Sequence, residues 1–189
     1  MTDTSSTDAW ALRATASSFN AVRGKLPATG DPDRPLDSVT VARQLSAVGI
    51  LLADLTDEVL FRDAEQRRDG YTSPAVTGFA AAIRPACEAA SALGTVAHRL
   101  SARDQALHLG DEPEAEENDR LVMGNALGIA DEALRETCEG LRAAAAAISP
   151  SPARVEAARS RSVTAAPSPA PPPPAIPPAA PPIRITRGR

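Results

Sequence analysis

Four stretches of the chain place apolar residues at the three- and four-residue spacings of an amphipathic helix. The most regular stretch is residues 36–66, and Asp37 or Ser38 can cap its N-terminus. Its apolar positions alternate spacings of four and three, as in a coiled-coil seam: Val41, Leu45, Val48, Leu52, Leu55 and Val59. This pattern predicts a long helix with one apolar side.

The first helix is predicted over residues 7–26, after a disordered segment at 1–6, and its periodicity is weaker. Either of two apolar stripes could form the buried side of this helix. One contains Trp10, Ala14, Ser17 and Ala21, and the other contains Leu12, Phe19, Val22 and Leu26. The sequence PATGDPDRP that follows has the proline, glycine and aspartate of a loop.

The third helix is expected to begin at Ser73-Pro74, since serine caps a helix and proline fits its first turn. Its predicted core stripe contains Val76, Phe79, Ile83, Ala86, Ala90, Leu93, Ala97, Leu100 and Leu107. Pro85 interrupts this stripe, so we expect a kink or the junction of two helices there.

The fourth helix is predicted from about Asp111, after Gly110, to Ser149-Pro150. Asp111 and Glu114 have the spacing of an acidic capping box. The core stripe of this helix contains Met123, Leu127, Ala130, Leu134, Cys138, Leu141, Ala145 and Ile148.

These elements predict an all-α fold, an antiparallel up-down bundle of about four helices, three long and one shorter at the N-terminus, within residues 1–149. Aromatic residues make up only 3% of the chain and hydrophobic residues 43%, so the core must be built from small aliphatic side chains. Alanine favours helices, whereas strands favour the β-branched and aromatic residues that are scarce here.

Residues 150–189 have a different composition, because they contain twelve of the 18 prolines. Such a segment favours extended polyproline II over a packed core, and we expect a disordered Pro/Ala-rich spacer with a basic tip. Arg184, Arg187 and Arg189 in this tip are candidate contacts for phosphates or for a protein partner. The PxxP spacings of the segment also match grooves that bind polyproline II, although any proline-rich run contains them.

The net charge of the chain also changes sign at residue 150. Up to Ser149 there are 14 basic and 23 acidic residues, a net charge of −9, whereas residues 150–189 have six arginines and one glutamate, a net charge of +5. An acidic bundle is a poor platform for nucleic acid, so any phosphate contact is expected through the tail alone.

The two cysteines form a candidate close pair. If the last two helices form a hairpin centred between residues 112 and 113, Cys87 lies level with Cys138. We expect two buried, reduced thiols that act as small hydrophobic groups, with a disulfide as the alternative.

No catalytic, cofactor-binding or metal-binding residues are predicted. The acidic run at 111–119 lacks the pattern of a calcium loop, and Asp104 with His108 supplies two ligands where zinc needs three or four. The first residues lack the features of a signal peptide, and we expect no apolar run long enough to cross a bilayer. The single lysine, Lys25, among abundant arginine and alanine suggests a GC-rich bacterial genome. A cytoplasmic protein without a membrane segment is therefore expected.

The leading functional hypothesis is a non-enzymatic helical-bundle protein that binds a protein partner, with homo-oligomerisation as one form of that binding. The alternative is a nucleic-acid accessory protein whose basic tail contacts phosphates.

Overall fold

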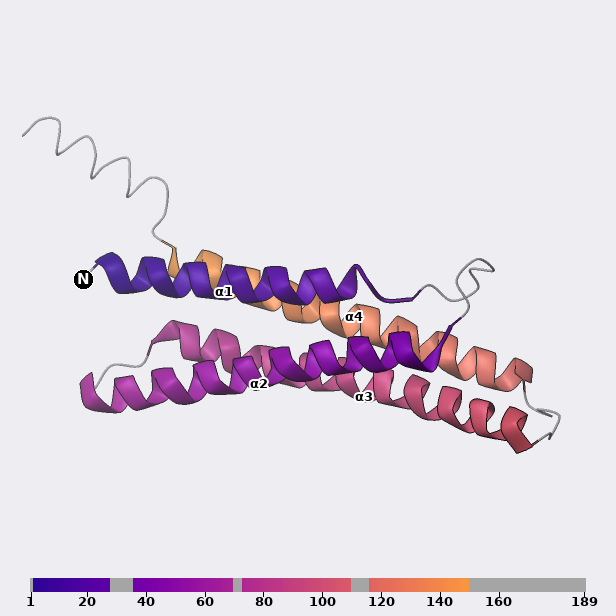
Figure 1. Cartoon of the computed structure of the whole chain (residues 1–189). Helices are drawn as coiled ribbons and strands as arrows, with labels where there is room; N and C mark the ends of the chain where they lie inside the picture. The colour runs from indigo at the N-terminus through magenta and orange to yellow at the C-terminus, as the bar shows by residue number, and fades with distance from the viewer. Residues whose placement is uncertain (1, 28–35, 70–72, 110–115, 150–189) are drawn as a thin grey trace, which may run out of the picture. The chain divides into compact units, whose positions relative to one another are not determined.

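The computed structural model describes residues 2–27, 36–69, 73–109 and 116–149. These residues form four helices, α1 (Thr2–Arg23), α2 (Ser38–Asp69), α3 (Pro74–Leu109) and α4 (Glu116–Ile148), each antiparallel to the next along the chain (Figure 1). The described residues contain no strand, and the predicted all-α bundle of four helices is confirmed. The predicted spacer at 150–189 lies outside them.

The helices pack in the order α2, α3, α4, α1. α3 contacts α2 on one side and α4 on the other, and α1 packs mainly on α4. α2 and α4 are not in contact, and α1 touches α2 only slightly. α2 is therefore supported mainly by α3.

Small residues let three of the helices approach closely at Gly78. A Cβ atom at this position would lie 2.6 Å from the Cβ of Ala144 on α4 and 3.3 Å from Cδ2 of Leu12 on α1. No side chain fits there without a shift of the helix backbones, so the packing of α1, α3 and α4 requires glycine.

The core follows most of the predicted stripes of α3 and α4. Every predicted position on α4 is buried except Ile148, which is half-buried. The predicted α3 stripe alternates between fully and partly buried positions, and its last member, Leu107, is wrong because 59% of it is exposed. On α1 the stripe with Leu12 and Phe19 is the buried one, whereas Trp10 is 69% exposed.

Side chains cap two helices as predicted. The backbone N–H of Thr40 donates to Oδ1 of Asp37 at 2.8 Å, and hydrogen bonds from Thr40 lower the pKa of the Asp37 carboxyl. At the start of α3, the N–H of Ala75 donates to Oγ of Ser73 at 3.2 Å, and Pro74 is the first helical residue.

The structure corrects several predicted boundaries. α1 begins at Thr2, so residues 2–6 are helical where we expected disorder, and it ends at Arg23 instead of residue 26. α3 continues through the buried Pro85 as one helix, which excludes the junction of two helices, one of the two outcomes expected there. α4 is described from Glu116, and both the predicted start at Asp111 and the predicted capping box lie outside the described residues.

A buried polar cluster fixes α1 to α2 and α3 at one end of the bundle. Asp8 of α1 is only 5% exposed, and it accepts hydrogen bonds from the guanidinium of Arg62 on α2 and, at 3.0 Å, from Oγ of Ser73. Nε of Arg62 also donates to Glu58 at 2.9 Å, and its guanidinium carbon lies 5.1 Å from the centre of the Phe79 ring. The cluster satisfies a buried carboxylate that would otherwise be costly to desolvate.

We predict that Asp8→Asn lowers the free energy of unfolding by about 3 kcal/mol, because it leaves the guanidinium of Arg62 largely buried without its main counter-charge. Urea unfolding followed by circular dichroism measures this change. Asp104→Asn is the matched control, because that carboxylate is 47% exposed and pairs with Arg103 only at 3.5 Å. The control should cost less than about 0.5 kcal/mol. Equal losses for the two variants would contradict the structural role of the cluster.

Candidate protein-interaction surface

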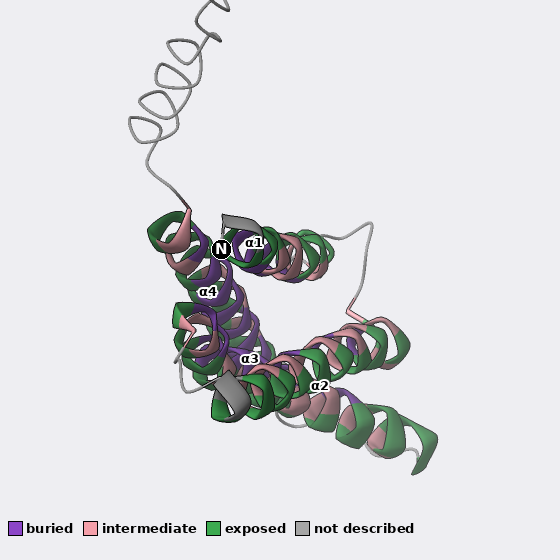
Figure 2. Cartoon of the chain, turned by 90° about the vertical axis from the view of Figure 1, so that its left-hand side faces the viewer, coloured by how far each residue is buried: buried purple, intermediate pink, exposed green. Residues whose placement is uncertain are grey.

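α2 buries one side and leaves the rest of its surface open. Its fully buried hydrophobic residues are Val41, Val48 and Leu55, one in each seven. The other members of the predicted seam, Leu45, Leu52 and Val59, are half-buried. Figure 2 shows the resulting contrast, because α2 is mostly green and pink whereas α3 and α4 have more buried residues. The open surface follows from the packing order, because α3 is the main neighbour of α2.

α2 nevertheless contains a long apolar window. An 18-residue window within Ser38–Glu65 has a mean hydropathy of 1.3, and only 17% of that window is buried. By length and composition alone this helix could cross a membrane, which corrects the expectation that no apolar run is long enough. In the folded bundle, much of this apolar surface faces outward.

The outward side of α2 carries a stripe of seven exposed residues that we call the outer stripe. Its members occupy successive turns of the helix on the side opposite Val48, since they follow one another at spacings of three and four. Its large apolar side chains are well exposed, with Ile50 at 61% and Phe61 at 63%. The outer stripe consists of Val39, Arg43, Ser46, Ile50, Asp54, Asp57 and Phe61.

The charges of the outer stripe are only weakly compensated within the described residues, where the carboxylate of Asp37 lies near Arg43. Arg43, Asp54 and Asp57 form no ion pair within the part of the chain that the structure describes. Long apolar side chains and unpaired charges of both signs therefore lie side by side on one helix face. Such a mixture is characteristic of a protein-binding surface, where apolar contacts give affinity and charges give orientation.

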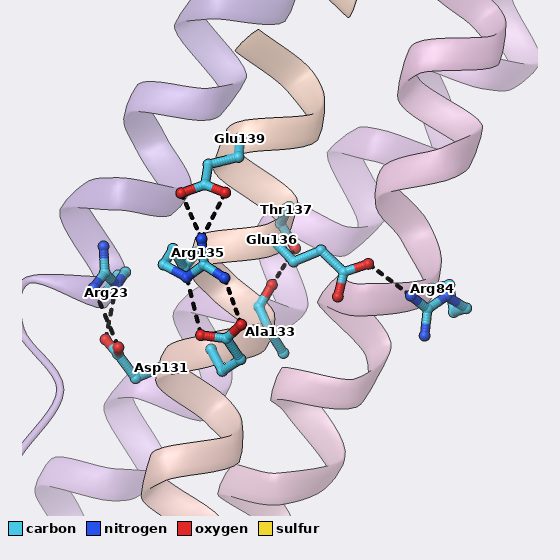
Figure 3. A network of polar contacts seen from close by, with 9 residues as sticks. Arg23, Arg84, Asp131, Ala133, Arg135, Glu136, Thr137 and Glu139 are labelled. Atoms are coloured by element: carbon cyan, nitrogen blue, oxygen red, sulfur yellow. Dashed lines mark hydrogen bonds and ion pairs between the residues drawn. The ribbon is translucent and has the colours of Figure 1, made fainter. Parts of the chain in front are cut away.

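α4 shows a different arrangement, because most of its charges are paired within the bundle (Figure 3). Arg23 of α1 donates to Asp131 at 2.7 Å, and Arg84 of α3 donates to Glu136 at 2.6 Å. On α4 itself, Arg135 bonds both Glu132 and Glu139.

The ion pairs on α4 shift the pKa values of the groups that form them. The hydrogen bond from Arg135 lowers the pKa of Glu132, and the carboxylates raise the pKa of Arg135. The charged face of α4 is thus largely neutralised by its neighbours, and it is a weaker candidate for binding a partner.

A shallow groove of about 490 Å³ lies between α3 and α4, on the side where Gly78 meets Ala144. Its lining is mainly small and apolar, and its one charged residue, Glu136, is already bonded to Arg84. Among the described residues, no three His, Cys, Asp or Glu side chains gather into a metal-binding group. The groove thus offers no charged or catalytic group free to act on a ligand.

The predicted site residues fall into two groups. Arg184, Arg187 and Arg189 lie outside the described residues. Both cysteines are free thiols, and the prediction of burial holds for Cys138 but is wrong for Cys87, which is exposed.

The helix register also differs from the predicted one. Because Gly78 meets Ala144, level residues of α3 and α4 have numbers that add to about 222, so Cys87 lies level with about residue 135. The predicted closeness of the two thiols stays a prediction.

Sequence reasoning missed the outer stripe because it followed only the inner seam of α2. A signal was present, since Ile50 and Phe61 lie outside the predicted seam and have no place in a core supplied by that seam. Large apolar residues on two sides of a long helix indicate either two neighbours in the bundle or a surface for a partner.

Comparisons with protein families, with curated proteins and with solved structures found no match. The functional interpretation therefore depends on the residues of this chain.

We predict that the two thiols react at very different rates in the folded protein. Cys87 is exposed, whereas burial raises the pKa of the Cys138 thiol and shields its sulfur, so less thiolate is available for attack. With a chromogenic disulfide reagent near pH 8, one thiol per chain should react at least about tenfold faster than the other. Cys87→Ser should remove the fast phase, and Cys138→Ser should leave it. Two fast thiols in the folded protein would show that Cys138 is accessible.

Proposed function

We propose that this chain is a non-enzymatic helical-bundle protein of the cytoplasm that binds another protein through the outer stripe of α2. Residues 150–189 act as a proline-rich spacer with a basic tip. The observation that carries the proposal is the apolar character of α2 combined with its low burial, 17% over the most apolar window. A soluble domain rarely exposes so much apolar helix surface without a partner to cover it.

Insertion of α2 into a membrane is the competing explanation for its apolar surface. Spanning a bilayer would expose Arg43 and Asp54 to hydrocarbon, at a cost of about 2.5 to 3.5 kcal/mol each near the centre of a helix. It would also remove Val41, Val48 and Leu55 from their packing in the hydrophobic core. A protein partner covers the same apolar residues and supplies counter-charges as well, so it is the better-supported occupant.

A second candidate function is that of a nucleic-acid accessory protein, and the charge of the tail favours it. Residues 150–189 have six arginines against one glutamate, and three of these arginines lie in the last six residues. Arginine pairs well with phosphate, although the segment has no aromatic residue to stack on bases.

The proposed function predicts covalent capture of a protein from one face of the bundle. A photoreactive amino acid at Phe61, introduced in cells that naturally produce the protein, should give light-dependent adducts with a polypeptide. The same group at Leu121 is the control, because Leu121 is 65% exposed on α4, outside the outer stripe. Adducts of equal yield from both positions, or adducts with lipid alone, would contradict the proposal.

The second candidate function predicts that the full chain binds non-specific DNA with an affinity that falls steeply as salt rises. Deletion of residues 150–189 should abolish this binding, because it removes the basic segment. Fluorescence anisotropy over a salt series measures it. Binding that survives the deletion, or no binding at low salt, would exclude a tail-mediated phosphate contact.

A further inference from the structure

The outer stripe has a symmetry that points to its partner. Its seven positions follow one another at spacings of four, three, four, four, three and four, so the stripe has the same spacing in both directions from Ile50. When two antiparallel copies of α2 meet at Ile50, each residue lies level with the residue whose number is 100 minus its own. Val39 then lies level with Phe61, Arg43 with Asp57, and Ser46 with Asp54.

We propose that the outer stripe binds a second copy of this chain, with the two α2 helices antiparallel and Ile50 on the two-fold axis. This inference rests on the proposed function, because it names the protein that the stripe binds. A two-fold axis makes the interface isologous, so every contact occurs twice. The stripe spans residues 39–61, about 33 Å at about 1.5 Å per residue.

The charges favour this arrangement over the alternatives. Arg43 and Asp57 are both exposed and have no ion-pair partner among the described residues, and the antiparallel dimer brings each to the other chain's opposite charge. A parallel dimer would instead align Arg43 with Arg43 and Asp57 with Asp57, which is repulsive. Complementary charge thus favours a second copy as the partner and the antiparallel orientation of the two α2 helices.

The remaining pairs of the stripe are compatible with the same contact. Ile50 meets its own copy at the centre, and Val39 packs against Phe61 at each end. Each charged pair therefore lies between the central apolar contact and an apolar contact at the end. The Ser46 hydroxyl can donate a hydrogen bond to the Asp54 carboxylate of the second copy. α3 packs on the buried side of α2, where Val48 lies, and leaves the outer stripe accessible.

Charge reversal tests the proposed pairs in the full chain. Analytical ultracentrifugation over a concentration series should detect a reversible dimer of twice 19.6 kDa. Arg43→Asp or Asp57→Arg alone should weaken dimerisation by about tenfold or more, because each creates two like-charge contacts. The double variant should restore it to within about threefold, because the pairs are re-formed with reversed signs. Arg142→Asp makes the same charge change on an exposed residue of α4 and should have no effect.

Disulfide trapping tests the orientation independently. In a Cys87→Ser background, Ile50→Cys should give a covalent dimer on mild oxidation, because the two introduced thiols meet on the axis. Ala64→Cys should not, because those positions lie 28 residues apart across the antiparallel pair, about 42 Å along the helix. Trapping of both variants would indicate a parallel pair and would overturn the proposed orientation.

Two results would overturn the second-copy proposal. One is a chain that stays monomeric at every concentration, and the other is a dimer that is insensitive to both single charge reversals. If the monomeric chain still forms light-dependent adducts with a different protein through Phe61, the proposed function stands and only the identity of the partner is wrong. If the wild-type chain instead binds phospholipid vesicles and forms no protein adduct, both proposals fail.

Discussion

The close approach of α3 to α4 is the constraint on which the rest of this structure depends. A core with few aromatic side chains has little bulk to bury, so its stability must come from many short-range contacts between small residues. At Gly78 the helices come so near that a single methyl group has no room. α1 then lies over the same crossing through Leu12, and α2 occupies the other side of α3. α2 is held by one helix and by the polar cluster at its C-terminal end, and this leaves its outer side without a neighbour.

The buried residues were predicted correctly for a helix with one apolar side. The prediction was less accurate for a helix with two apolar sides. α4 has a single unbroken stripe, and its buried positions agree with the prediction from Met123 to Ala145. α1 has two comparable stripes, and periodicity alone could not show that Leu12 is buried while Trp10 is exposed, because that choice is made by α3 and α4. Helix starts were predicted well where a side chain caps the backbone, as at Asp37 and Ser73.

The register of the α3–α4 hairpin could not be predicted in the same way, because it depends on how small residues interlock. A turn centre inferred from Gly110 placed Cys87 opposite Cys138, but the meeting of Gly78 and Ala144 shifts the level positions by about three residues. A shift of this size moves the level positions by about 4.5 Å along the helix axis. Cys87 is exposed for a separate reason, because it lies on the side of α3 away from the buried Ala86 and Ala89. The candidate interaction surface was missed for a related reason, because the exposure of a helix depends on how many neighbours it has. Arg43 and Asp57 could be recognised as candidates only once the structure showed that many other charges of the bundle, such as those of Asp131 and Glu136, form ion pairs.

The packing of α1 on α4 has a consequence for the order of folding. α1 is the first helix to be synthesised and α4 the last, and the hydrogen bond from Arg13 to Ser149 joins residues 136 positions apart in the chain. α2 and α3, and then α3 and α4, can pair as soon as each hairpin is complete, because their contacts close short loops. α1 must wait with Leu12 and Phe19 uncovered until α4 is made. A nascent chain of this protein therefore leaves the apolar side of α1 uncovered for the longest time.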